Sequence, residues 1–221
     1  MRAPAAILAL VLAGCTADGT QDRFLAKYAD PEPARGNVLV CHGYGCRLQD
    51  RVDLRAAWAG LVAPLAAPAP DAAEERRRIA AVIAAFEGHV GSRTRTAGDV
   101  GGTFAGFGQD GQLDCIDEAA NTTTYLTLLE RAGLLAWHEV RAPMSRGFFV
   151  NGWPHTSAVI AETAGGGAFA VDAWFHSNGA PAEIVGLDEW LGGWNPEGVE
   201  TERVVAVSAA PAHIVVPPRE P

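Results

Sequence analysis

Residues 111–134 read "GQLDCIDEAANTTTYLTLLERAGL", a polar loop that turns into a helix and ends near a glycine. Asp114 has the side chain of an N-cap residue, and Asp117 stands three positions later, where a capping-box carboxylate belongs. We therefore predict that Cys115 is the first helical residue and that Gly133 ends the helix. Unpaired backbone N–H groups and the helix dipole favour a thiolate at this position. This placement makes Cys115 a candidate nucleophile.

Two residues further along the chain complete a candidate triad. His155 begins the β-like run "HTSAVIAE" (155–162), and Asp172 lies in the next run, "AFAVDAWF" (168–175). Cys115, His155 and Asp172 are then a thiol, a base and a group that orients the base. This combination is typical of acyl transfer through a covalent thioester.

Alternatives exist for two members of the triad. His138 and His176 could each replace His155 as the base. A carboxylate inside an apolar strand needs a partner, which favours Asp172 over Asp188 and Asp110 as the orienting group.

The register of the two runs decides whether His155 and Asp172 can meet. If the connection "TAGGGA" is centred between Thr163 and Ala164, the two residues stand opposite each other on one face. If it is centred on Gly166, Asp172 points to the other face. The triad therefore requires an asymmetric use of the glycine-rich connection.

Apolar residues at helical spacing predict two helices before the cysteine helix, over residues 50–65 and 72–88. The run "ERRR" at 75–78 is read as a solvated helix face, and residues 91–113, with seven glycines, as a long functional loop. The apolar stripes consist of Leu54, Trp58, Leu61 and Leu65 in the first helix and Ile79, Val82, Ile83 and Phe86 in the second.

Short β-like runs dominate the chain after the cysteine helix, in which Ala119, Leu126 and Leu129 form the buried stripe. Helices followed by strands in blocks indicate an α+β fold with a mostly antiparallel sheet, formed by a single domain over residues 36–216. The predicted strands cover residues 136–142, 147–151, 155–162, 168–175, 183–187 and 202–208.

These features resemble the transglutaminase-like superfamily, most closely its bacterial periplasmic cysteine-proteinase branch. The resemblance covers roughly residues 110–176: a helix-opening cysteine, a histidine that starts a strand about 40 residues later, and an aspartate on the next strand. It implies a papain-like core with Cys115 as nucleophile, His155 as general base and acid, and Asp172 as the group that orients the imidazole. No cofactor or metal is implied, and the substrate is expected to be a protein or peptide.

The surroundings of Cys115 differ from the family pattern. Asp114 stands where the family has a glycine, and the acids Asp117 and Glu118 would oppose thiolate formation if they pointed at the sulfur. The Cys115 backbone N–H is one expected oxyanion donor, and a side-chain amide of Gln109 or Gln112 is the candidate for a second. Trp153 and Trp174 are candidates for lining the cleft or for core packing.

The N-terminus predicts export. Residues 1–14 carry one basic residue and an apolar run too short to span a bilayer, followed by Cys15. Leu-Ala-Gly-Cys resembles the bacterial lipobox, which implies a lipid on Cys15; a plain secretion signal is the alternative. Residues 15–35 then form a tether and 217–221 a tail. We expect a periplasm-facing protein held on the cell envelope, with the outer membrane favoured over the inner because Thr16 follows the cysteine.

The four cysteines can be assigned in this compartment. Cys41 and Cys46 flank a short loop in "LVCHGYGCRL" and are expected to form a disulfide, which leaves Cys115 free. The alternatives are a Cys41–Cys115 bridge, or a metal site that uses Cys41, His42 and Cys46.

Composition and motifs exclude other classes of protein. With 17 basic and 26 acidic residues and no basic cluster, nucleic acid is not an expected partner. "NVLVCHGYG" resembles the oxyanion turn of α/β-hydrolases, but no Gly-x-Ser-x-Gly sequence accompanies it, and Ser145 and Ser177 lack flanking glycines. A non-catalytic lipoprotein that binds a peptide or cell-wall partner remains the alternative from another class.

Overall fold

The computed structural model describes residues 23–24, 26–28, 32–103, 106–107, 109–147 and 154–197 of the 221-residue chain. The predictions that fall outside these residues are the signal segment, the lipidation of Cys15, the position of Trp153, the strand at 202–208, nearly all of the strand at 147–151, and the tail.

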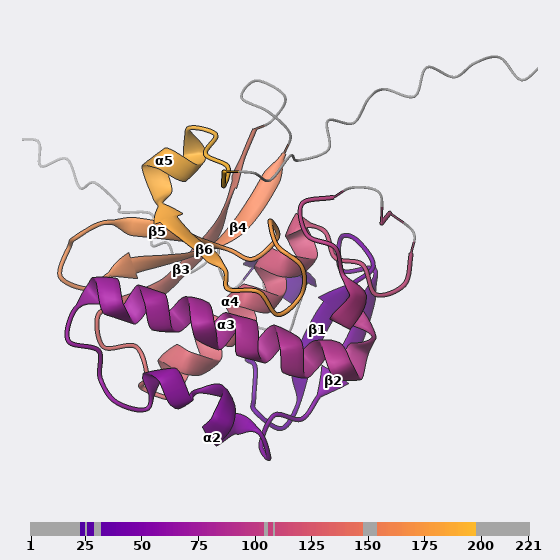
Figure 1. The fold of residues 1–221 in the computed structure, drawn as a ribbon, viewed down its shortest axis with the longest axis horizontal. Coiled ribbons are helices and arrows are strands. Elements are labelled where there is room, and N and C mark those ends of the chain that lie inside the picture. Colours follow the sequence, from indigo (N-terminus) through magenta and orange to yellow (C-terminus); the bar gives the residue numbers. More distant parts are fainter. Residues whose placement is uncertain are drawn as a thin grey trace, which may run out of the picture.

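The described residues form an α+β fold in which both sheets are antiparallel, so the expected fold class is confirmed at this level (Figure 1). In chain order the elements are β1 (Val38–His42), β2 (Leu48–Val52), α2 (Trp58–Leu61), the 3-10 turn η1 (Ala63–Leu65), α3 (Ala72–Thr94), the 3-10 turn η2 (Thr96–Gly98), α4 (Cys115–Arg131), β3 (His138–Arg146), β4 (His155–Glu162), β5 (Ala168–Asp172), β6 (Glu183–Gly186) and α5 (Leu187–Leu191).

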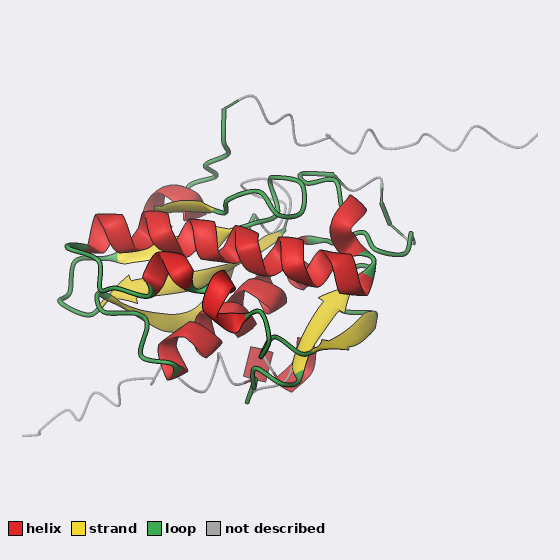
Figure 2. Ribbon diagram, turned by 60° about the horizontal axis from the view of Figure 1, so that its bottom comes forward, coloured by secondary structure: helices red, strands yellow, loops and turns green. Residues whose placement is uncertain are grey.

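Helix α4 lies between the two sheets. The β1–β2 hairpin packs on one side of it, and the four-stranded meander, in the order β3-β4-β5-β6, packs on the other (Figure 1). The long helix α3 crosses α4 and covers the core from outside (Figure 2). Phe86 of α3 and Tyr125 of α4 stack at a ring-centroid distance of 4.9 Å in that core. The stripe of Ala119, Leu126 and Leu129 is buried as predicted.

Burial on α4 extends well beyond that stripe, because every residue from Asp117 to Leu129 is buried. The threonines of this stretch would leave buried hydroxyls without partners. Thr123 and Thr124 solve this by donating to the carbonyl oxygens four residues earlier, at 2.6 and 2.8 Å. A helix between two sheets therefore tolerates polar residues that the apolar stripe did not predict.

Helix α3 is confirmed and is longer than predicted. Asp71 caps it by accepting a hydrogen bond from the Glu74 N–H at 2.7 Å, and all four predicted core side chains are fully buried. The helix continues to Thr94, so the predicted loop at 91–113 begins too early. Packing explains a glycine at position 91 inside the helix, because a Cβ there would lie 2.6 Å from the Asn178 side chain.

The predicted helix at 50–65 is wrong. Residues 48–52 form strand β2, and only Trp58–Leu61 is α-helical. Leu54, Leu61 and Leu65 are buried as expected, but they reach the core from a loop and two short helical turns. Two strands therefore precede the helices, and the predicted order of helices followed by strands does not hold. The described strands contain no parallel pair, which contradicts the α/β-hydrolase alternative.

The β4–β5 register differs from both registers considered above. Ala161 pairs with Ala168 and Ala158 with Val171, which centres the connection between Ala164 and Gly165. His155 and Asp172 are therefore diagonal neighbours on one face, two positions apart along the ladder. The requirement that they share a face is met by a register that neither alternative had given.

A buried carboxylate joins α3 to the start of β3. Glu75, at 0% exposure, accepts hydrogen bonds from the backbone N–H groups of Ala136 and Trp137 at 2.7 and 2.9 Å. It also pairs with His138 Nδ1 at 2.9 Å. The reading of 75–78 as a solvated face is therefore wrong at Glu75, because the chain after α4 supplies donors for this charge.

Candidate functional site

The first turn of α4 has the predicted geometry. Asp114 is the N-cap and accepts from the N–H groups of Ile116 and Asp117 at 3.0 and 2.9 Å. The Asp117 carboxylate accepts in return from the Asp114 N–H at 3.2 Å, which completes a capping box. Cys115 is the first helical residue and is 8% exposed.

The structure brings His155 and Asp172 together. His155 Nε2 lies 2.6 Å from Asp172 Oδ2, and both side chains are buried. Because Nε2 is directed at the carboxylate, Nδ1 is the imidazole nitrogen that remains for chemistry. A carboxylate that accepts from one nitrogen fixes both the ring orientation and the tautomer.

Two further donors hold the Asp172 carboxylate. The indole Nε1 of Trp190 donates to Oδ2 at 2.7 Å, and the backbone N–H of Trp174 donates to Oδ1 at 3.3 Å. Trp190 is fully buried in α5, where the Arg146 guanidinium covers its ring at 4.5 Å. The sequence analysis missed Trp190, and a tryptophan 18 residues from the aspartate gives no local signal.

Aromatic rings surround the imidazole and connect it to the thiol. The His155 ring lies 4.9 Å from the Trp174 ring, 5.3 Å from Phe175 and 5.5 Å from Trp190. Cys115 packs against two of these rings, Trp174 and Phe175, in a small apolar cluster. Trp174 is thus in contact with both the nucleophile candidate and the base candidate.

The environment of Cys115 favours the neutral thiol when no ligand is bound. Burial raises the pKa of Cys115 to about 12, the N–H of Thr156 acts in the opposite direction, and the charges of Asp114 and Asp172 add to the rise. Among the described residues, no hydrogen bond joins this sulfur to the imidazole. Apo sites often have such loose geometry, which tightens when substrate binds.

Of the acids in the first turn of α4, Asp114 carries the charge that acts on the sulfur. Burial raises the pKa of Asp117 to about 7, with further help from Asp114. Burial and the neighbouring Glu87 raise the pKa of Glu118 well above its ordinary value, which favours its neutral form. The expected opposition from Glu118 is therefore weakened by its own burial.

The alternative bases are used elsewhere. His138 donates from Nδ1 to Glu75, because the Arg76 guanidinium, 3.1 Å from Nε2, can only donate. Strand pairing places His138 beside Glu162, at the end of β4 opposite to His155. His176 is bonded to Glu183 at 2.7 Å.

The two candidate oxyanion glutamines have different surroundings. The Gln112 amide donates to the Gly98 carbonyl at 3.0 Å and accepts from the Val100 N–H at 3.3 Å, so it holds the loop before α4. Gln109 is exposed in the same loop. The Cys115 backbone N–H, at the open end of the helix, acts on the sulfur together with the Thr156 N–H.

Cys41 and Cys46 form a disulfide, and Cys115 is the free cysteine of the described residues. The alternative bridge between Cys41 and Cys115 is therefore wrong. The alternative metal site is also contradicted, because both sulfurs are in the disulfide and His42 pairs with Asp50 at 3.2 Å.

No protein-family profile matches this chain, and neither the curated proteins nor the solved structures include a significant match. Within the described part of the chain, no helix combines the length and apolar character that a membrane span requires. The site itself is therefore the basis for assigning a function.

Proposed function

We propose that the protein is a cysteine-dependent amide acyl-transfer enzyme of the transglutaminase-like superfamily with a papain-like core. The triad is Cys115, His155 and Asp172, and the reaction is that of a peptidase, an amidase or a transglutaminase. The observation that carries this proposal is the buried 2.6 Å contact between His155 Nε2 and Asp172 Oδ2, beside a cysteine that opens a helix.

The proposed reaction follows from these positions. The Cys115 thiol transfers its proton to His155 Nδ1, and the sulfur attacks the carbonyl carbon of an amide. The Cys115 N–H stabilises the negative oxygen of the tetrahedral intermediate. The C–N bond then breaks as the leaving amine takes the proton from His155, and a thioester remains on Cys115. Water or a second amine gives a proton to the imidazole and releases the acyl group.

The burial of the thiol fits this sequence of steps. Burial disfavours an isolated thiolate, so the sulfur ionises below about pH 7 only as an ion pair with the protonated imidazole of His155. Transfer of the thiol proton to His155 forms that pair, and burial strengthens the attraction between its two charges. Catalysis then depends on the charge of His155, which Asp172 stabilises.

The proposed location is the periplasmic side of the bacterial cell envelope. A lipid on Cys15 would hold the domain on the membrane, the outer more than the inner, through a tether of about 20 residues. A protein or peptide is the proposed substrate, and no cofactor is needed for this chemistry.

A non-catalytic lipoprotein with the same fold, which binds a peptide or a cell-wall partner, is the second candidate. It is favoured by the burial that leaves Cys115 8% exposed and raises its pKa to about 12. In that case Cys115 would be a core residue whose role is packing against Trp174 and Phe175.

The two candidates predict different alkylation of Cys115. We would purify the full chain in detergent and measure the rate of iodoacetamide labelling between pH 5 and 10, resolved at Cys115 by peptide mass. For the enzyme, labelling persists below about pH 7 and falls at least about tenfold at low pH in His155→Ala. His176→Ala, which removes a half-buried histidine bonded to Glu183, is the matched control and leaves the profile unchanged.

Labelling that rises only at alkaline pH and ignores His155→Ala would contradict the enzyme and support the binding protein. For the enzyme, Cys115→Ala keeps the melting temperature within a few degrees and abolishes release of amine from amide substrates.

A further inference from the structure

The loop closed by the Cys41–Cys46 disulfide has an unusual backbone. Four consecutive residues are left-handed, with φ of 79°, 71°, 66° and 59° at Gly43, Tyr44, Gly45 and Cys46. Two of them are not glycine, and each such residue costs about 1–2 kcal/mol in this conformation. The disulfide, with a Cα–Cα distance of 4.6 Å, joins the two ends of this turn.

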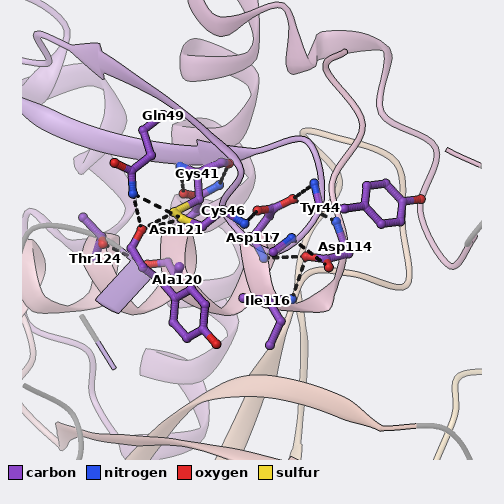
Figure 3. Close-up of a disulfide and its surroundings, with 12 residues drawn as sticks. Cys41, Tyr44, Cys46, Gln49, Asp114, Ile116, Asp117, Ala120, Asn121 and Thr124 are labelled. Atoms are coloured by element: carbon purple, nitrogen blue, oxygen red, sulfur yellow. Dashed lines mark hydrogen bonds between the residues drawn. A yellow bond between two sulfur atoms is a disulfide. The ribbon is translucent and has the colours of Figure 1, made fainter. Parts of the chain in front are cut away.

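The left-handed turn presents its N–H groups to the start of α4 (Figure 3). The N–H groups of Tyr44 and Cys46 donate to the two Asp117 oxygens at 2.7 and 2.6 Å. The N–H of Gly45 donates to Asp114 Oδ2 at 2.9 Å. Successive backbone N–H groups that converge in this way form a cradle for anions, and here the anions are two carboxylates of the nucleophile helix.

A second attachment lies one turn further along α4. Asn121 accepts from the Cys41 N–H at 2.8 Å and donates to the Cys41 carbonyl at 2.9 Å (Figure 3). The Gly43 N–H also donates to the Gln112 carbonyl at 2.9 Å. The loop is thus fixed to the chain on both sides of Cys115.

The contact is a cradle of N–H groups rather than a metal site. The Cys41 and Cys46 sulfurs and an Asp117 oxygen lie within 4.8 Å of one another, but the sulfurs are bonded to each other. Both Asp117 oxygens already accept hydrogen bonds from the loop.

We propose that the disulfide-closed loop Cys41–Cys46 is a positioning element for Cys115, which holds the Asp114 and Asp117 carboxylates and limits the repulsion between Asp114 and a Cys115 thiolate. The inference rests on the proposed function in taking Cys115 as the nucleophile. Hydrogen bonds from N–H groups fix a carboxylate in place and set partial positive charge against it, which weakens its repulsion of a thiolate. Loss of the cradle would leave the two carboxylates held by the capping box alone.

Several other titratable groups face the thiol or its first helical turn, and all of them except Tyr44 lie outside the loop. They are His155 on β4, Asp172 on β5, Glu118 on α4 with Glu87 of α3 behind it, Asp99 in the loop before α4, and Tyr44 in the cradle. Tyr44 stays neutral, because burial followed by the charge of Asp99 raises its pKa to about 12.

The test is the pH midpoint of iodoacetamide labelling at Cys115 in the full chain. In the double variant Cys41→Ala/Cys46→Ala, we expect the midpoint to rise by about one pH unit or more, which is a tenfold loss of thiolate at a given pH. Ile83→Ala, in the main core away from the loop, is the matched control, because it lowers stability and leaves the midpoint in place. The addition of Asp114→Asn to the double variant should restore the midpoint, since asparagine caps a helix as well as aspartate does.

An unchanged midpoint in the double variant, or a raised midpoint that Asp114→Asn does not restore, would overturn the proposal. If the double variant fails to fold, dithiothreitol provides the same comparison in the folded wild type: it passes two electrons and two protons to Cys41 and Cys46 and becomes a cyclic disulfide itself. Peptide mass separates label on these two thiols from label on Cys115. The proposed function fails separately, when His155→Ala leaves the wild-type profile unchanged.

Discussion

Asp172 accepts hydrogen bonds from His155, from the Trp190 indole and from the Trp174 backbone N–H. Three donors satisfy a buried charge that would otherwise be costly, and they leave the carboxylate a single orientation. Trp190 bonds the same oxygen as His155 does, so its N–H holds that oxygen in place beside the imidazole. At the scale of single residues, the candidate base is therefore positioned by a residue that need not touch substrate.

The variant Trp190→Phe tests this role. Phenylalanine keeps the aromatic packing and removes one charge-assisted hydrogen bond of about 1.5–3 kcal/mol. We expect labelling of Cys115 at pH 6 to fall about tenfold, because a less rigid Asp172 stabilises the imidazolium less well. Trp58→Phe, where the ring packs 5.9 Å from Phe86, is the matched control. Equal labelling rates in the two variants would show that Trp190 is only a core residue.

The part of the site that can be predicted from the sequence is the part formed by residues close together in the chain. The capping box of Asp114 and Asp117 depends on a spacing of three positions, which can be read directly from the sequence. The contact between His155 and Asp172 depends on a register that the glycine-rich connection leaves open. The indole of Trp190 comes from a separate element, so neither periodicity nor spacing could identify it.

At the scale of elements, the buried contact between Glu75 and the start of β3 joins the first half of the chain to the sheet. Glu75 accepts from two backbone N–H groups and from His138 Nδ1. In Glu75→Gln, the NH₂ group of the amide is a hydrogen-bond donor that faces other donors. We expect a loss of about 2–4 kcal/mol in the free energy of unfolding, measured by urea denaturation.

A matched control for this variant lies next to it on α3. Glu74→Gln changes a carboxylate that bonds Arg77 and Arg78 at the surface, and we expect a clearly smaller destabilisation than in Glu75→Gln. Similar losses in both variants would contradict a special role for Glu75. The labelling profile of Cys115 should remain that of the wild type, since Glu75 lies at the far end of the sheet.

Most elements after α3 were predicted, including the short strands β5 and β6, whereas strand β2 and helix α5 were not. The stripe from Ile79 to Phe86 identified α3, and the run 155–162 has the bounds of β4. Leu54 and Leu61 are buried and stand at helical spacing, but Leu54 follows the second strand of the hairpin and Leu61 belongs to the short helix α2. Tertiary contacts decide the backbone conformation of this segment, because an apolar stripe with this spacing fits several conformations equally well.

At the scale of the whole molecule, two buried acids lie between α3 and α4. Burial raises the pKa of Glu87 from 4.5 to about 8, and Glu118 interacts with it. Burial likewise raises the pKa of Glu118, helped by Glu87, Asp99 and Asp117. A pKa raised on folding means that the stability from the protonated pair is complete below about pH 4.5 and is lost as pH rises through about 8.

The variant Glu118→Gln tests this pH dependence. The amide keeps the shape of the protonated acid and cannot ionise, so the decline in melting temperature between pH 5 and 8 should become shallower. At pH 8 we expect the variant to melt at least about 3 °C above the wild type, from a gain of about 1 kcal/mol or more. Glu189→Gln, on the exposed side of α5, is the control and should follow the wild-type curve. Parallel curves for all three proteins would refute the assignment.

Helix α4 has no solvent-facing side from Asp117 to Leu129, because one sheet covers each flank. A substitution in this stretch must fit two packed surfaces at once, whereas α3 can change freely along its outer face. Random mutagenesis would therefore accept few replacements in the helix that Cys115 opens. The nucleophile candidate stands at the end of a segment that tolerates few substitutions, and its position can persist while the surrounding loops diverge.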